Sequence, residues 1–195
     1  MRQPWERPSL VREGDPDPNH TYFSVGRVLS QWEGVEIQLG YVYTAAVGRL
    51  GDWWALLEYG EGRAFLGRFN ILKAAISNLF VRLPNQEVEG KLDCFLIKVN
   101  DFAARRHDVA HGIVRDRGWA NWRLPHDPGD TTGYFLLPSH YKGRAYDSSA
   151  LPTYAYTAQS MEALRHHLIQ LETEAMGIAQ LVNRHVSDKA REGYE

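Results

Sequence analysis

The chain has one cysteine, almost no net charge and no long apolar run, and each shortage excludes a class of protein. The single Cys94 cannot form an internal disulfide, so nothing indicates an oxidising compartment. Its 22 basic and 24 acidic residues give a formal charge of −2, so no broad basic face of the kind that binds duplex DNA is expected. No window approaches the roughly 18 uninterrupted apolar residues that span a bilayer, and residues 1–19 lack the apolar core of a signal peptide. We therefore expect a cytoplasmic protein without membrane contact.

Several motifs that carry chemistry or mark multidomain chains are missing as well. There is no glycine-rich phosphate loop, no arrangement for a nucleophilic serine or cysteine, and no His-Glu-x-x-His pattern. We expect no cofactor. Without an internal repeat or a long linker, the chain is expected to form one helical domain over residues 20–186. Residues 1–19 are expected to be a flexible segment, and residues 187–195 a charged tail.

Apolar residues recur at alternating steps of three and four along four stretches, which predicts four amphipathic helices. Pro84 ends the second stretch, Gly112 follows the third, and Thr157 is suited to cap the fourth. The helices are expected over about residues 22–50, 63–83, 86–111 and 157–186.

The stretch over residues 114–156 interrupts this rhythm. It is rich in glycine, proline, aspartate and aromatic residues, and residues 134–137 and 153–156 have the composition of short strands. Residues 51–62, between the first two helices, are expected to form a packed loop or a short helical turn. The predicted fold is therefore all-α: a four-helix bundle with an irregular or β-hairpin insertion between the third and fourth helices.

The third predicted helix carries Arg106 where its pattern calls for an apolar residue. A guanidinium stays charged at any biological pH, so a buried one needs a carboxylate, a phosphate or several carbonyl groups. Glu36, on the apolar stripe of the first helix, and its neighbour Glu33 are candidate partners. Such a pairing is compatible with function, because the carboxylate would orient the guanidinium. The stripe that Arg106 interrupts is formed by Val88, Leu92, Phe95, Val99, Phe102, Val109 and Ile113.

His111 follows five residues after Arg106, at the predicted end of the helix. An imidazole is the side chain best suited to moving protons near neutral pH. At about 100° of helical phase per residue, His107 and His111 lie about 40° apart, beside the stripe that contains Arg106. A cation next to a general base is the minimal equipment for phosphoryl chemistry. The structural alternative is that His111 only complements the helix dipole.

The heptapeptide Arg106-His107-Asp108-Val109-Ala110-His111-Gly112 resembles the HEPN superfamily of helical domains. The hallmark of that family is an arginine, a polar residue and then a histidine after four to six intervening positions, at the end of a long helix. The order of the predicted helices is also similar, over about residues 22–186. The resemblance implies a metal-independent endoribonuclease whose homodimer brings two motifs into one cleft. It also implies a toxin–antitoxin or phage-defence setting with an antitoxin protein as a partner.

Carried over residue by residue, the resemblance makes His111 the general base, Arg106 the phosphate-stabilising cation and His107 the polar residue after it. Arg105 also fits the pattern, so the register is open by one position; we favour Arg106 because it lies on the apolar stripe. Arg105 and Glu36 are candidate substrate-binding residues. The base would take a proton from the ribose 2′-hydroxyl, which DNA lacks, so the mechanism predicts specificity for RNA.

Two other functions remain open. The first is a non-catalytic HEPN-like module that binds a nucleotide or mediates dimerisation. The second is a metal site built on the i,i+4 pair His107 and His111, with Asp108 or the pair His166 and His167 as further ligands. Zinc and iron sites need a third and usually a fourth ligand, and the sequence supplies no recognised pattern for them.

Overall fold

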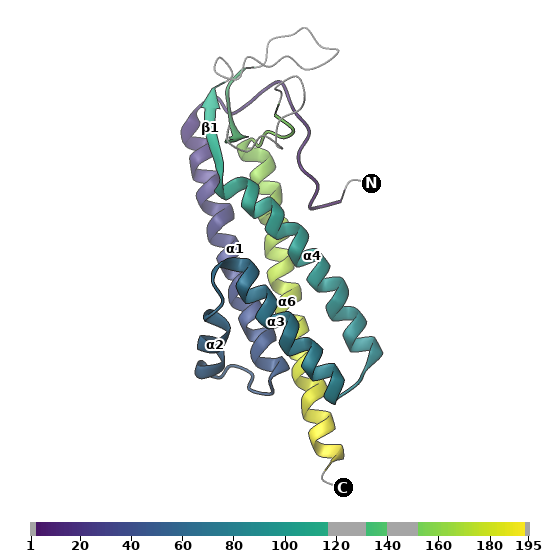
Figure 1. Cartoon of the computed structure of the whole chain (residues 1–195). Coiled ribbons are helices and arrows are strands. Elements are labelled where there is room, and N and C mark those ends of the chain that lie inside the picture. Colours follow the sequence, from purple (N-terminus) through teal and green to yellow (C-terminus); the bar gives the residue numbers. More distant parts are fainter. Residues whose placement is uncertain (1–2, 117–131, 140–151, 194–195) are drawn as a thin grey trace. The chain divides into compact units, whose positions relative to one another are not determined.

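The computed structural model describes residues 3–116, 132–139 and 152–193, and this part of the chain is mostly helical (Figure 1). It contains five helices and one antiparallel sheet of two strands. The helices are α1 (Pro18–Ala46), α2 (Trp53–Gly60), α3 (Ala64–Arg82), α4 (Gln86–Ala110) and α6 (Ala158–Glu192), and the strands are β1 (Gly112–Asp116) and β2 (Tyr134–Pro138).

All four predicted helices are present, as α1, α3, α4 and α6. Helix α1 starts and ends about four residues earlier than the periodicity indicated, and α6 continues to Glu192. Between α1 and α3 the chain forms the eight-residue helix α2. The carboxylate of Asp52, the residue before this helix, accepts a hydrogen bond from the Ala55 amide at 2.8 Å. Such a cap satisfies one of the amides that a helix start leaves without a partner.

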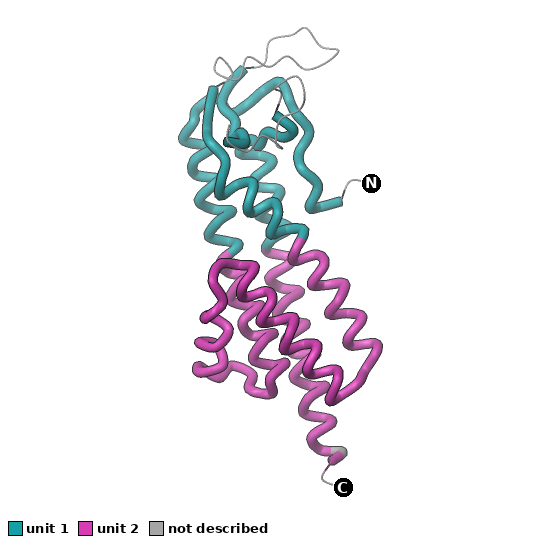
Figure 2. Tube along the Cα trace, in the orientation of Figure 1, with its two compact units in different colours: residues 1–32, 101–168 teal, residues 33–100, 169–195 magenta. Residues whose placement is uncertain are grey.

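The chain divides into two compact units, which Figure 2 shows in different colours. Unit 1 comprises residues 1–32 and 101–168, and unit 2 comprises residues 33–100 and 169–195. Helices α1, α4 and α6 each contribute one part to each unit, whereas the sheet belongs to unit 1 and α2 and α3 belong to unit 2.

The sheet of unit 1 lies directly after the helix that carries the HEPN-like motif. Strand β1, which the sequence did not predict, pairs with β2 so that Gly112 faces Pro138 and Val114 faces Leu136. Of the predicted strand over residues 153–156, only Tyr156 pairs with β2, through backbone hydrogen bonds of 2.9 and 3.0 Å to Leu136. The rest of the predicted insertion, residues 117–131 and 140–151, lies outside the described residues.

Gly112 is required by the pairing of the strands. A Cβ at this position would lie 2.7 Å from Cγ of Leu136, closer than real contacts allow. The backbone at Gly112 is not in the left-handed conformation of a helix-ending glycine. Glycine therefore stands here because β2 approaches closely.

The segment before α1, expected to be flexible, makes defined contacts in unit 1. Asp15 is buried, exchanges backbone hydrogen bonds with Tyr134 at 2.8 and 2.9 Å, and accepts one from the Thr21 hydroxyl at 2.6 Å. Its carboxylate also accepts from the amide of Ala158 at 2.9 Å, at the start of α6. One carboxylate thus joins the segment, α1 and α6.

In unit 2 the helices pack around an apolar interior, and polar contacts join α6 to α4 and to the end of α3. Lys98 of α4 forms an ion pair with Glu174 of α6 at 2.7 Å, and Nε2 of His185 lies 2.9 Å from the Leu83 carbonyl. The side chains that fill the interior include Val35, Leu39, Val42, Leu72, Leu79, Leu92, Phe95, Val99, Leu171, Ala175 and Val182.

Helix α3 is the one described helix whose length and composition would suffice to cross a membrane, with a mean hydropathy of 1.2. This is weak support for a membrane span, because the core helix of a soluble protein passes the same test. Leu72, Ile76 and Leu79 of α3 are buried in unit 2, and 33% of the apolar window of this helix is buried.

Candidate functional site

The two motif histidines lie side by side at the end of α4, in unit 1. The ring centroids of His107 and His111 are 4.4 Å apart, and both side chains are exposed. Their spacing explains the contact, because residues four apart are neighbours on a helix surface. The His111 amide donates to the His107 carbonyl at 3.2 Å, so the helical geometry persists to the end of the motif. The structure therefore presents two imidazoles to solvent at one point.

The backbone of His111 is also held by a hydrogen bond from the residue that follows the neighbouring strand, β2. The Ser139 hydroxyl, directly after β2, donates a hydrogen bond of 2.7 Å to the carbonyl of His111. Because β1 begins at the next residue, Gly112, the position of His111 is fixed by the helix before it and by the strand after it. A fixed backbone limits the places that the imidazole can reach.

Asp108, between the two histidines in sequence, has a structural role. It is buried and accepts two hydrogen bonds from Arg7, from Nε at 2.9 Å and from Nη2 at 3.0 Å. Arg105 adds an ion pair of 3.4 Å to the same carboxylate. The hydrogen bonds to Asp108 raise the pKa of the Arg7 guanidinium, which also lies 4.4 Å above the ring of Tyr154.

Two buried tyrosines close this cluster. The rings of Tyr154 and Tyr156 meet edge to face, with centroids 5.6 Å apart. Burial raises the pKa of both hydroxyls above the usual tyrosine value, and the nearby charge of Asp108 adds to the effect. Both tyrosines therefore stay neutral at any biological pH.

The two candidate motif arginines have different surroundings. Arg105 is bound to Asp108, and its side chain is only 14% exposed. Arg106 is partly buried and lies about 100° around the helix from His107, whereas Arg105 lies about 160° from it on the other side. Around the helix from His111, Arg106 lies about 140° away and Arg105 about 120°, so phase alone does not separate the two arginines. Arg106 is favoured because Arg105 is already bound to the buried Asp108.

Glu36, expected as a partner of Arg106 or of substrate, belongs to unit 2. Its carboxylate accepts hydrogen bonds from Nε of Arg68, at 2.6 Å, and from Nη2 of the same side chain. The apolar pattern of α3 did not point to Arg68, because that arginine lies beside the stripe formed by Phe65, Phe69 and Leu72.

The metal alternative lacks a third ligand in the part of the chain that the structure describes. There, no three His, Cys, Asp or Glu side chains are grouped so that they could hold a metal ion. Asp108 is buried with its two arginines, and Nδ1 of His166 lies 2.9 Å from the Glu162 carbonyl of its own helix. The ring of His167 lies 6.4 Å from that of Phe102.

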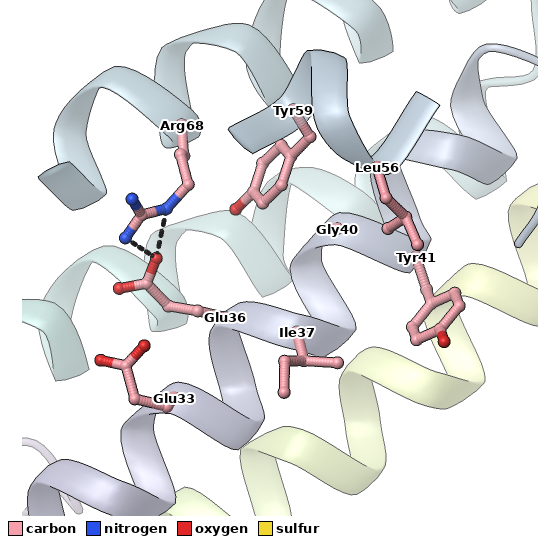
Figure 3. Close-up of a pocket in the computed structure, with 8 residues that line it drawn as sticks. All are labelled: Glu33, Glu36, Ile37, Gly40, Tyr41, Leu56, Tyr59 and Arg68. Atoms are coloured by element: carbon pink, nitrogen blue, oxygen red, sulfur yellow. Dashed lines mark hydrogen bonds and ion pairs between the residues drawn. The ribbon is translucent and has the colours of Figure 1, made fainter. Parts of the chain in front are cut away.

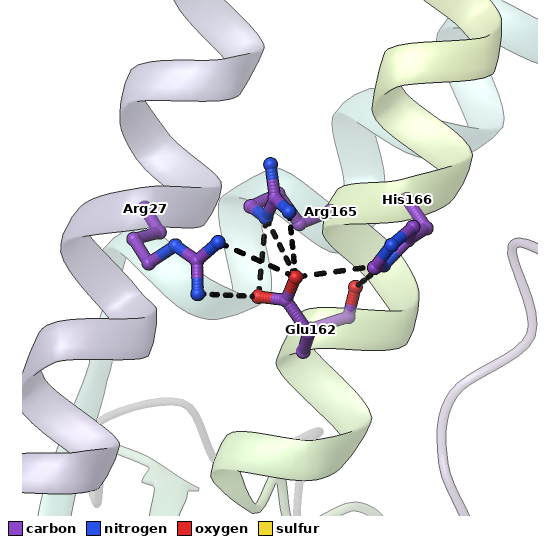
Figure 4. A network of polar contacts seen from close by, with 4 residues as sticks. All are labelled: Arg27, Glu162, Arg165 and His166. Carbon is purple, nitrogen blue, oxygen red and sulfur yellow. Dashed lines mark hydrogen bonds and ion pairs between the residues drawn. The ribbon is translucent and has the colours of Figure 1, made fainter.

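A second polar surface of unit 1 was not foreseen from the sequence (Figure 4). In the figure, Glu162 of α6 lies between Arg27 of α1 and the side chains of Arg165 and His166. Hydrogen bonds from Arg165 lower the pKa of Glu162, which therefore remains ionised. Two arginines against one carboxylate leave an excess of positive charge.

An exposed aromatic ring borders this surface. The guanidinium of Arg27 lies 5.5 Å from the ring centre of Phe23, whose side chain is 67% exposed. Positive charge beside an exposed ring is the combination that binds single-stranded nucleic acids through phosphates and stacked bases. The i,i+3 spacing of Glu162 and Arg165 is the only signal of this surface in the sequence, because Arg27 is distant in the chain.

Comparisons of the chain with protein-family models, with curated proteins and with solved structures gave no match.

Proposed function

We propose that this protein is an HEPN-like, metal-independent endoribonuclease whose reacting side chains are His111, His107 and Arg106. The observation that carries the proposal is the pair of exposed imidazoles, 4.4 Å apart at the end of α4. The proposal includes the finer fold, a four-helix bundle of the HEPN type formed by α1, α3, α4 and α6. It also includes a cytoplasmic homodimer in a toxin–antitoxin or phage-defence system, with an antitoxin protein as a partner.

The chemistry needs a base, an acid and a cation. In the proposed reaction, His111 takes the proton of a ribose 2′-hydroxyl, and the oxygen attacks the adjacent phosphorus. The bond from phosphorus to the 5′-oxygen breaks, and an imidazolium donates the proton that this oxygen needs, from His107 or from the second copy of the motif. The guanidinium of Arg106 stabilises the negative charge on the phosphoryl oxygens. The products are a 2′,3′-cyclic phosphate and a 5′-hydroxyl.

The surface around Arg27, Arg165 and Phe23 supports RNA as the substrate. It lies in the same unit as the histidine pair and offers both phosphate-binding charge and a stacking ring. The overall charge of −2 does not conflict with this role, because the positive charge is local.

The test is cleavage of a mixed-sequence RNA in EDTA by the wild type and by H111A, H107A and R106A. We expect cleavage that leaves cyclic phosphate ends and falls by about 10²-fold or more in H111A and R106A. Arg82→Ala is the matched control for R106A, since it removes an exposed arginine of unit 2, away from the surface around Arg27 and Arg165, and it should cleave like the wild type.

Other outcomes separate the alternatives. Cleavage that EDTA abolishes would support a metal enzyme. No cleavage of any RNA, together with binding of a nucleotide, would support the non-catalytic module. A wild type that remains monomeric in light scattering, yet cleaves, would overturn the composite dimer site and leave His107 as the acid.

A further inference from the structure

Helix α2, in unit 2, carries apolar side chains on two opposite sides. Ala55 and Tyr59 are buried in the unit, whereas Trp53, Trp54 and Leu57 are exposed. At about 100° per residue, the three exposed side chains fall within an arc of about 100°, opposite the buried pair. A helix that is apolar all round is normally buried. The exposed arc therefore indicates a surface that a partner covers.

A cavity of about 320 Å³ lies in the same unit, between α1 on one side and α2 with the first turns of α3 on the other (Figure 3). Leu56 forms an apolar wall, and Ile37 lies 58% exposed at the mouth. Because Leu56 follows Trp53 by three residues, the two are neighbours on the surface of α2. The cavity and the exposed tryptophan thus lie side by side on one face of the unit.

Gly40 leaves room in this cavity. A Cβ at this position would lie 3.2 Å from Cδ2 of Leu56 and 3.3 Å from the ring of Tyr59. The volume of the cavity is at the lower end of the range of small-molecule sites, so it suits a single aromatic side chain.

Tyr59 brings a hydrogen-bonding group into the cavity. The side chain is 5% exposed, and its hydroxyl makes no hydrogen bond to any described residue. In Figure 3 the hydroxyl points into the cavity, on the side of Glu36 and Arg68, which bind each other. Burial raises the pKa of Tyr59, so the group stays a neutral hydroxyl that can accept an N–H. Native proteins rarely leave a buried hydroxyl without a partner, so the cavity is expected to receive a group that bonds to it.

An indole ring matches both properties of the cavity. Its body is apolar, and its one N–H needs an acceptor when the ring is buried. Trp53 offers such a ring, 65% exposed, on the face that contains the cavity. A protruding side chain next to a matching cavity makes a surface self-complementary, because a twofold axis between them brings each into contact with the other copy.

We propose that two copies of this chain meet at this face, with Trp53 of each copy in the cavity of the other. The indole N–H donates to the Tyr59 hydroxyl, and the ring packs against Ile37 and Leu56. The contact rests on the homodimer of the proposed function but not on its chemistry. A lipid surface fits this face less well: residues 49–63 contain two basic and three acidic residues, whereas helices that lie on membranes are rich in lysine and arginine.

The first test measures self-association by sedimentation equilibrium at increasing protein concentration. We expect a reversible dimer, and Trp53→Ala should weaken it by about 100-fold, because buried tryptophans are typical interface hot spots and the dimer contains two. Trp54→Ala is the matched control, since it removes an equally exposed ring about 100° further around α2, and it should change the dissociation constant by less than about threefold. A wild type that stays monomeric, or equal weakening by the two variants, would overturn the proposal.

The second test uses free indole as the probe for the cavity, in the Trp53→Ala variant. We expect saturating indole to shift the amide resonances of Gly40 and Tyr59, and 1-methylindole, which lacks the N–H, to bind about fivefold more weakly. Tyr59→Phe should remove this difference and weaken the dimer of the otherwise wild-type chain by about tenfold, without lowering the melting temperature. Tyr156→Phe removes a similarly buried hydroxyl in unit 1 and should leave both affinities unchanged. Equal binding of the two indoles, or no shift at these amides, would overturn the proposal.

Assembly and cleavage separate this contact from the proposed function. H111A should lose cleavage and keep the dimer. A dimer that survives Trp53→Ala, in a protein that cleaves RNA, would overturn the contact and leave the proposed function standing. A dimer that Trp53→Ala dissociates, in a protein that cleaves no RNA, would do the reverse. Binding of a monomeric wild type to phosphatidylcholine vesicles would overturn the contact in favour of a lipid surface.

Discussion

Arg7 donates two hydrogen bonds to Asp108, 101 residues later in the chain, at 2.9 and 3.0 Å. The contact ties the segment before α1 to the centre of the heptapeptide that carries the two histidines. Arg105 shares the carboxylate, and Tyr154 covers the Arg7 guanidinium. The motif therefore has an outer side, with His107 and His111, and an inner side that holds unit 1 together.

The first prediction follows from this inner side. Asp108→Asn removes the charge that compensates Arg7 and Arg105, and should destabilise the protein by about 2–3 kcal/mol. The value lies below that for a fully buried pair because the Arg7 side chain is 38% exposed. Urea unfolding measures it, with the exposed Asp188→Asn as the control for the same chemical change. Equal stability of the two variants would show that the ion pairs of Asp108 do not stabilise the protein.

The second prediction concerns two glycines that differ in their surroundings. Gly112→Ala should destabilise by about 1–3 kcal/mol, because its Cβ would overlap Leu136 and force β1 and β2 apart. Gly90→Ala, in the exposed part of α4 with nothing within 4 Å of the added Cβ, should stabilise by about 0.5–1 kcal/mol. Thermal unfolding of both variants tests the opposite signs. A stabilised Gly112→Ala would contradict the close packing of β2.

The helices were predictable from the sequence where an apolar stripe continues over many turns, as in α3 and α6. Helix α2 was expected only as one of two alternatives, a packed loop or a short helical turn, because it has eight residues and no continuous apolar stripe: Trp53 and Trp54 are exposed while Tyr59 is buried. Strand β1 was missed because Ile113 and Val114 are too short an apolar run to indicate a strand.

The candidate site was predictable only in its local part. The contact of His107 with His111 follows from helical spacing. The structural roles of Asp108 and Glu36 do not follow from spacing, because their long-range partners, Arg7 and Arg68, are set by tertiary packing. Arg105 contacts Asp108 at the local i,i+3 spacing, but the sequence does not show that this carboxylate is buried. Glu36 and Arg68 are 32 positions apart in the chain, and the periodicity of apolar residues does not indicate that they form an ion pair.

The third prediction concerns the pH dependence of stability that arises at the start of helix α2. The hydrogen bond from the Ala55 amide, with help from Arg49, lowers the pKa of Asp52 below the ordinary value of an aspartate. A lowered folded-state pKa contributes stability that is present above pH 4 and is lost as the pH falls through the folded value. Asp52→Asn keeps a capping oxygen but removes this titration.

We therefore expect the wild type to be more stable than Asp52→Asn at pH 6, and the difference to shrink steadily towards pH 2. Urea unfolding at several pH values measures this difference. Asp188→Asn, exposed near the end of α6, provides the comparison and should show no such trend. A difference that grows on acidification would contradict the assigned sign.

The last prediction tests the surface that would hold RNA, in an H111A background so that the RNA stays intact. Arg165→Gln and Arg27→Gln should each weaken binding of a single-stranded RNA and reduce the salt dependence of log Kd by about 0.7 per lost phosphate contact. Glu162→Gln should act in the opposite direction, because it removes the one carboxylate between these arginines. Fluorescence anisotropy at several salt concentrations measures both quantities, with Arg82→Gln in unit 2 as the control. If all four variants bind alike, the RNA does not cross this surface, and the histidine pair must receive its substrate from another side of α4.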